Sequence, residues 1–220
     1  MSEFANGKVS PWGYIIDAQN LPDFINASEF NMFTGRKFTG DTRVEANIPS
    51  ATASIRNYCG WHIAPELHCG MWYAIKDLRD AYVGGDLLVQ LPSTFVTSVV
   101  KVLIDATYDP TTKEYSGEEW TDYDIDSNGL LRLYDVGLRD RRAKLFIHYV
   151  AGHPMTNISV IKELTANKIT HAVTNTYGVN SEAAGGVSVS YNSSWTGKGS
   201  TALTDDTREV LNAYKVKGVF

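Results

Sequence analysis

The middle of the chain alternates short apolar runs with turn-forming residues, and this pattern most restricts what the chain can fold into. The runs are rich in β-branched and aromatic residues and are bounded by pairs such as Gly84-Gly85 and Asn128-Gly129. Such runs are typical of short strands joined by tight turns. The predicted strands contain Met71–Ile75, Leu87–Leu91, Phe95–Ile104, Leu130–Tyr134 and Lys144–Tyr149. Asn-Gly suits a tight turn with positive φ, so the clearest hairpin is predicted at residues 127–130.

The residues before this region show helical spacing. One set of apolar residues is alternately four and three positions apart, as on one face of an amphipathic helix. Its members are Val44, Ile48, Ala51, Ile55 and Tyr58. Pro49 lies inside the run and lacks an amide donor, so we expect either a kink or a helix whose regular part begins there. Gly60 is expected to end this helix.

Three further helices are predicted. Ser28 is expected to cap a short one that Gly35 ends. A longer helix follows Pro154, and its apolar stripe is Ile158, Ile161, Leu164, Thr165, Ile169, Ala172 and Val173. The last helix is predicted to start near residues 204–206, because Asp206 and Glu209 have capping-box spacing. Its inward-facing residues are predicted to be Val210, Leu211 and Tyr214.

These patterns predict an α+β protein with a mainly helical core, a bundle, into which an antiparallel β block is inserted. Residues 1–20 contain Gly7, Pro11 and Gly13 and are expected to form an irregular N-terminal arm. The helical core is assigned to residues 21–68 and 154–220. The inserted β-strand domain is assigned to residues 69–153.

Charge and hydropathy argue against several classes of protein. The chain has 20 Lys and Arg against 25 Asp and Glu, a net charge of −5, whereas proteins that grip nucleic acid normally have a basic excess. The most apolar stretch, Phe95–Ala106, is interrupted by Lys101 and Asp105 and is too short for a membrane helix. No basic head precedes an apolar block, so no signal peptide is expected. Two cysteines do not suggest a disulfide framework.

A cluster of cysteines and histidines is the first candidate for chemistry. Cys59, His62, His68 and Cys69 are types of residue that zinc prefers, and four of them would close a structural site. However, the connecting residues form a short extended link in which Pro65 prevents a helix. We therefore favour packing at the end of the helix over metal binding.

A second candidate resembles a calcium-binding loop. Asp124, Asp126, Asn128 and Gly129 follow the first part of the calcium-loop pattern, and Asp135 stands where the bidentate Glu would be. Both flanks alternate like strands rather than helices, and Asp and Asn are favoured in turns for local reasons. A hairpin is the preferred interpretation, and no metal or other cofactor is expected.

The remaining charged residues suggest contacts rather than catalysis. Arg139, Arg141, Arg142 and Lys144 form the densest basic cluster, which would contact a phosphate or an acidic partner or else lie in a solvated loop. The chain lacks a phosphate-binding Gly-Lys-Ser/Thr loop and a Gly-x-Ser-x-Gly elbow. We therefore predict no catalytic residues and no enzyme.

Several segments resemble the head–tail connector, or adaptor, proteins of long-tailed bacteriophages. The stretch Arg43–Trp61 and its continuation to Pro65 contain a Tyr-Cys-Gly-Trp motif like the one that ends the second helix of that family. Phe33-Thr34-Gly35 is similar to the end of the first helix. Residues 126–133 are similar to the family's hairpin. The resemblance continues through a long helix at residues 160–177, a strand at residues 187–191 and a helix at residues 203–215.

The resemblance implies a non-enzymatic virion protein at the neck. Such proteins form a homo-oligomeric ring, typically twelvefold, beneath the portal protein, and the ring receives a stopper or tail-completion protein. Double-stranded DNA passes through its channel, and the negative charge suits a channel that must not hold phosphates. The implied location is the head–tail interface of the virion, reached from the host cytoplasm during assembly, with no membrane partner.

The portal or subunit interface is predicted at the C-terminal segment, with Val210, Leu211 and Tyr214 as its apolar face. Folding of this face onto the chain's own helices is the alternative. Arg139, Arg141 and Arg142 are the second candidate interface. A different reading of the whole chain is a virion β-domain that binds metal or carbohydrate at the tail through residues 120–134, and a third is a zinc enzyme.

Overall fold

The computed structural model describes most of the chain. The described residues are 4, 7–74, 82–126, 128–136, 144–174, 181–184, 187–190 and 203–216. They form two compact units. The first, here called the β unit, comprises Met1–Leu21, Gly60–Met155 and Val216–Phe220. The second, the helical unit, comprises Pro22–Cys59 and Thr156–Lys215.

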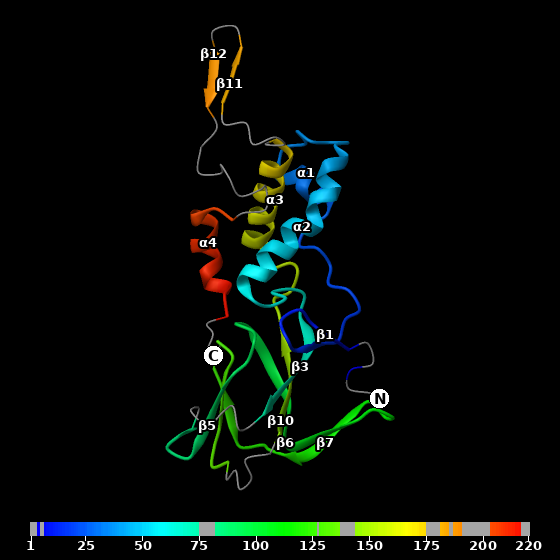
Figure 1. The fold of residues 1–220 in the computed structure, drawn as a ribbon, viewed down its shortest axis with the longest axis vertical. Helices are drawn as coiled ribbons and strands as arrows, with labels where there is room; N and C mark the ends of the chain where they lie inside the picture. Colours follow the sequence, from blue (N-terminus) through cyan, green and yellow to red (C-terminus); the bar gives the residue numbers. More distant parts are fainter. Residues whose placement is uncertain are drawn as a thin grey trace. The chain divides into compact units, whose positions relative to one another are not determined.

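The β unit contains two antiparallel sheets (Figure 1). The six-stranded sheet has the order β1 (Lys8–Val9), β2 (Ile15–Ile16), β3 (Leu67–Ala74), β10 (Lys144–Ala151), β6 (Val96–Asp109) and β7 (Glu114–Glu119). The four-stranded sheet has the order β4 (Tyr82–Val83), β5 (Asp86–Gln90), β9 (Leu130–Leu133) and β8 (Tyr123–Ile125). The Tyr73 hydroxyl of β3 donates to the Gln90 carbonyl of β5 over 2.7 Å, which links the two sheets.

The central strand of the larger sheet is β10. It pairs with β3 on one side and β6 on the other, and five consecutive residues from Leu145 to Tyr149 are buried. Burial on both faces explains why residues 145–151 are apolar except for His148 rather than alternating. The smaller sheet alternates instead: Leu87 and Val89 of β5 are buried while their neighbours are partly exposed.

The predicted irregular arm contains two short strands. Ile15 and Ile16 of β2 pair with Gly70 and Cys69 of β3, so the N-terminal residues extend the six-stranded sheet. Tyr14 and Ile16 are fully buried. These strands have only two residues each. Strand β2 is defined by its long-range pairing with β3, and β1 by its pairing with β2.

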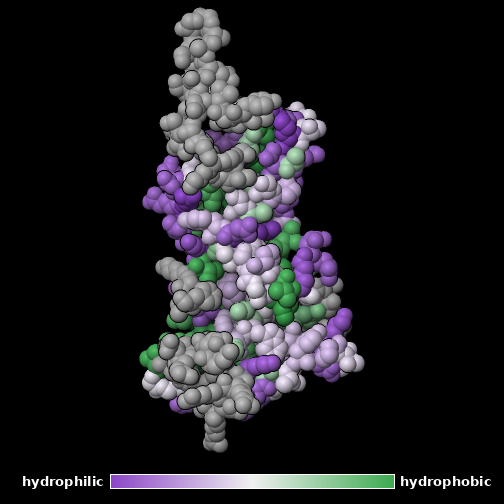
Figure 2. Space-filling view, viewed as in Figure 1, coloured by the Kyte–Doolittle hydropathy of each residue, from purple (hydrophilic) through white to green (hydrophobic). Residues whose placement is uncertain are grey.

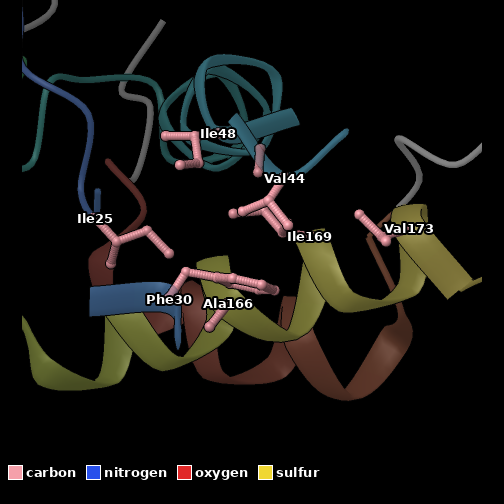
Figure 3. Close-up of a cluster of buried hydrophobic side chains, with 8 residues drawn as sticks. Ile25, Phe30, Val44, Ile48, Ala166, Ile169 and Val173 are labelled. Carbon is pink, nitrogen blue, oxygen red and sulfur yellow. The ribbon is translucent and has the colours of Figure 1, made fainter. Parts of the chain in front are cut away.

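The helical unit is built from helices of two distant parts of the chain. Its elements are α1 (Ala27–Phe33), α2 (Thr42–Cys59), α3 (Ser159–Thr174), β11 (Ser181–Ala184), β12 (Val187–Ser190), α4 (Asp205–Leu211) and the 3₁₀ turn η3 (Asn212–Tyr214). Val44 and Ile48 of α2 point toward Ile169 of α3, with Phe30 of α1 beside them (Figure 3). The predicted stripe of α2 is thus confirmed as a core face.

One helix start differs from the prediction, and a second excludes one of two predicted alternatives. Asn26, not Ser28, caps α1: its side chain accepts a bond from the Glu29 amide, and the Glu29 carboxylate accepts one from the Asn26 amide. Helix α2 already begins at Thr42 and continues through Pro49. The proline removes one donor from the helix ladder, but the buried residues on both sides of it hold the helix together.

The predicted fold class, a mainly helical core with an inserted β block, is wrong. In the described part of the chain the strands make up sheets of six, four and two strands, so the protein is rich in β-structure rather than a helical bundle. The prediction underestimated strands because several have few apolar residues. Strand β7, Glu114–Glu119, has exposed residues at five of its six positions. No helix in the described ranges has the length and apolar character needed to cross a membrane.

Candidate functional site

The structure places the predicted C-terminal interface on helix α4 and the turn η3. Leu211 is fully buried, and its carbonyl lies 3.8 Å from the Cys59 Sγ at the end of α2. The Tyr58 hydroxyl donates to Asn212 Oδ1 over 2.9 Å, and the Lys215 ammonium lies 5.1 Å from the Tyr58 ring centroid. The segment thus packs on α2 of its own unit, as in the alternative considered from the sequence.

Only part of that apolar face is at the surface. Val210 is 42% exposed and Tyr214 is partly exposed, so these two are the accessible members of the predicted interface. Arg139, Arg141 and Arg142 lie outside the described residues.

The structure does not gather the four Cys and His residues into one site. Cys59 ends α2 in the helical unit, whereas His62, His68 and Cys69 belong to the β unit. Burial raises the pKa of the Cys59 thiol to about 12 and also raises the pKa of Cys69, so both are protonated at neutral pH. Within the described ranges no group of three or more His, Cys, Asp or Glu residues is arranged to hold a metal ion.

The two histidines instead make hydrogen bonds within the β unit. His62 is buried, with Nε2 3.0 Å from the Ala151 carbonyl oxygen and Nδ1 2.8 Å from the Tyr14 hydroxyl. Because a carbonyl only accepts, this network assigns the proton to Nε2 and makes Tyr14 the donor to Nδ1. His68 Nδ1 lies 3.0 Å from His148 Nε2 on the neighbouring strand.

The calcium-like sequence forms the predicted hairpin. Strands β8 and β9 pair antiparallel, with Ile125 opposite Leu131, which confirms the hairpin. Asp126 Oδ1 accepts bonds from the amides of Asn128 and Leu130 over 2.9 and 2.8 Å. Asp124 Oδ2 accepts one from the Tyr134 hydroxyl over 2.6 Å. These oxygens stabilise the turn, and the Trp120 indole likewise donates to the nearby Asp122 carbonyl.

A pocket that the sequence did not reveal lies on the six-stranded sheet. It has a volume of about 500 Å³ and is lined by Trp72, Tyr73, Ala74, Tyr108, Tyr115 and Lys144. These residues come from four strands, β3, β6, β7 and β10, at the end of the sheet where β10 begins. The volume is within the usual range for small-molecule sites.

The register explains why these side chains, except that of Tyr73, share one face of the sheet. Lys144 pairs with Ala74, and Phe146 pairs with both Trp72 and Leu103, so these residues lie on the same face. Tyr108 pairs directly with Tyr115.

A β-bulge brings Tyr108 to this face. Between the pairs Ile104–Glu118 and Thr107–Ser116, strand β6 has Asp105 and Ala106 where β7 has only Gly117. Two residues opposite one are the mark of a bulge, and Asp105 has a φ of 53°. A Cβ on Gly117 would lie 2.7 Å from the Ile104 carbonyl oxygen, so the close approach requires glycine. Without the extra residue, Tyr108 would point to the opposite face from Leu103.

Aromatic packing holds the pocket wall in place. The Tyr115 ring stacks on Phe146 with centroids 3.9 Å apart and an interplanar angle of 13°. The ring centroids of Trp72 and Tyr108 lie 5.4 and 5.0 Å from that of Tyr115. Phe4 contacts Tyr115 and Phe146 edge to face at 6.0 and 6.2 Å. The wall is therefore a packed layer, and Tyr108, 48% exposed, is its outermost ring.

Lys144 supplies the charge of the pocket. It is exposed, and among the described residues no carboxylate lies within salt-bridge distance of its ammonium. The described lining residues include no carboxylate, imidazole or thiol. Burial raises the pKa of the Tyr73 hydroxyl above its ordinary value. Its described residues thus offer aromatic ring faces and the Lys144 ammonium to a ligand.

The chain matches no protein-family model and no curated protein. The residues and contacts described above are therefore the basis on which its function is inferred.

Proposed function

We propose that this protein is a structural subunit of a bacteriophage neck that assembles into a ring-shaped head–tail connector. In this role it would lie between the portal protein and the stopper or tail-completion protein, and the ring would extend the channel for DNA. The resemblance of the segments around residues 43–65, 126–133 and 160–215 suggests this role.

The observation that best supports assembly is the exposed apolar surface of the helical unit. Met32 is 70% exposed and Phe33 48% exposed at the end of α1, while Val160 of α3 and Val210 of α4 are 41% and 42% exposed. On the face drawn in Figure 2, hydrophobic residues lie among hydrophilic ones. A closed ring needs two complementary surfaces on each subunit, and such mixed surfaces are typical of interfaces between proteins.

The hairpin of β11 and β12 also favours assembly. These strands pair only with each other among the described strands, in a register from Ser181–Ser190 to Ala184–Val187. A two-stranded hairpin is marginally stable alone in water. Contact with a neighbouring subunit in a ring would supply the missing stabilisation.

Light scattering with size-exclusion chromatography, followed by negative-stain microscopy, tests the proposal. The wild-type chain is expected to form rings, alone at high concentration or on isolated portal rings. The double variant Met32→Ser, Phe33→Ser should remain monomeric with an unchanged circular dichroism spectrum. The matched control is Val83→Ser, which alters a 57% exposed residue of the β unit and should leave assembly unchanged.

Two results would contradict the connector role. One is a wild-type chain that stays monomeric at all concentrations and does not bind portal rings. The other is assembly that the Met32, Phe33 variant leaves intact while Val83→Ser abolishes it, because the interface would then lie on the β unit.

A further inference from the structure

We infer that the aromatic pocket of the β unit binds a planar aromatic ring joined to an anionic group, the chemistry of a nucleotide. The site goes beyond the connector role and does not depend on it, because the pocket lies within one sheet of a single β unit.

The ring faces are the first part of the inference. Tyr115 is stacked on Phe146 on one side, so its position is fixed before any ligand binds. Trp72 and Tyr108 flank it at interplanar angles of 61° and 39°, and both are at least partly exposed. Preorganised aromatic side chains on a sheet are a common platform for stacking nucleobases, since every base has a π face.

The charge of the pocket is the second part. Lys144 lies on the same face of the sheet as Trp72, because it pairs with Ala74 two residues along β3. Among the described residues its ammonium has no carboxylate within salt-bridge distance. A lysine at the edge of an apolar site is a usual partner of phosphate.

The same residues argue against other ligands. A cation would be repelled by Lys144. A neutral sugar is normally held by carboxylate or amide side chains that bond adjacent hydroxyls, and the described lining has neither type of group. A purely apolar ligand would bring no charge to oppose that of the Lys144 ammonium. An aromatic ring with a phosphate satisfies both the ring faces and the cation.

Isothermal titration calorimetry on the full chain tests this inference. The probes are adenosine monophosphate, adenosine, inorganic phosphate, methyl glucuronide and a short single-stranded oligothymidylate. We expect saturable binding of adenosine monophosphate, at least tenfold weaker binding of adenosine and no measurable binding of phosphate alone. Binding of the oligonucleotide tighter than that of the mononucleotide would support the same chemistry and identify a nucleic-acid strand as its source.

Four variants locate the site. Tyr108→Ala removes the outermost ring and Lys144→Gln removes the charge, and each should weaken adenosine monophosphate binding by about tenfold. Phe95→Ala changes a 39% exposed aromatic residue elsewhere in the β unit, and Lys37→Gln changes an exposed lysine of the helical unit. Both controls should bind like the wild type, and melting temperatures would confirm that all four variants are folded.

Several outcomes would overturn the inference. Absence of saturable binding to both the mononucleotide and the oligonucleotide would show that the pocket does not bind nucleotides. Equal binding by folded Tyr108→Ala and Lys144→Gln variants would place the site elsewhere. Tighter binding of the glucuronide than of the nucleotide would assign the pocket to acidic sugars instead.

Discussion

The two units bury their cores in different ways. The largest buried side chains of the β unit include Trp61, Tyr14 and Tyr149, and at its centre the polar His62 is bonded to Tyr14. The cluster that joins α1, α2 and α3 consists of Ile, Val, Ala and Phe residues without a polar side chain. The β unit therefore places a histidine–tyrosine hydrogen bond among its large aromatic side chains. In the helical unit the buried polar residues, Thr52, Arg56, Thr165 and Lys168, are not members of the apolar cluster.

The largest effect is expected in the β unit from Trp61→Ala. Trp61 is fully buried between His62 and His153, with ring centroids at 5.4 and 6.1 Å. Truncation should lower the free energy of unfolding by about 3–5 kcal/mol, measured by urea denaturation. The sequence assigned Trp61 to the helical core, but the structure places it in the β unit. A loss below about 1 kcal/mol would show that the large aromatic residues do not dominate this core.

The corresponding test of the helical unit is Leu211→Ala. Because Leu211 is fully buried against the end of α2, its truncation should cost about 3 kcal/mol by the same measurement. Val210→Ala, at an exposed neighbouring position, serves as the control and should change stability by less than about 0.5 kcal/mol. If Leu211→Ala left the free energy of unfolding unchanged, Leu211 would again be a candidate for a portal interface.

Tyr14→Phe tests the claim that hydrogen bonds stabilise the β unit. The Tyr14 hydroxyl donates to His62 Nδ1 and accepts from the His62 amide over 3.1 Å. Removing it deletes both bonds in a buried position and should cost about 1–3 kcal/mol, with the ring packing retained. Thermal denaturation of Tyr14→Phe beside Tyr108→Phe, which alters an exposed hydroxyl, gives the comparison. Equal melting temperatures for the two variants would contradict the difference drawn between the units.

The smallest expected effect is the loss, at low pH, of the stability that the Lys162–Glu29 ion pair gives the helical unit. The hydrogen bond from Lys162, with Nζ 2.7 Å from Glu29 Oε1, lowers the pKa of Glu29, although partial burial opposes this. A lowered folded-state pKa means that the contribution is present above the unfolded pKa of about 4.3 and is lost as pH falls through the folded value. For this partly exposed pair we expect less than about 1 kcal/mol. The variant Lys162→Gln should flatten the stability profile between about pH 5 and 3, and a profile like that of the wild type would exclude the pair as its cause.

Local patterns predicted the elements that depend on local physics. The spacing of Val44 to Ile55 identified the buried face of α2, and Asn128-Gly129 identified the hairpin. Strand β2 was missed because it is defined by pairing with β3, which is more than fifty residues away in the sequence. Strand β1 was missed because it consists of two exposed residues that pair only with β2. Strand β7 was missed because its exposed residues are mostly polar.

The aromatic pocket was missed for a different reason. Its rings come from strands that no short motif connects, and Tyr108 would be assigned to the wrong face by strict alternation from Leu103. The bulge that reverses this assignment involves Asp105 and Ala106, which have no distinctive sequence signal. Gly117 is the only local hint, since a glycine inside a strand often marks a bulge or a close backbone approach.

The order in which the chain is made has a consequence for the helical unit. Helix α2 ends at Cys59 and its partner α3 begins at Ser159, so a growing chain releases α2 long before α3 exists. At about 5–20 residues per second, the roughly 100 intervening residues take on the order of 5 to 20 seconds to synthesise. During that interval the face of Val44 and Ile48 has no α3 to cover it. Newly made chains in a crowded cell would therefore be most prone to aggregation, and most in need of chaperones, before α3 leaves the ribosome.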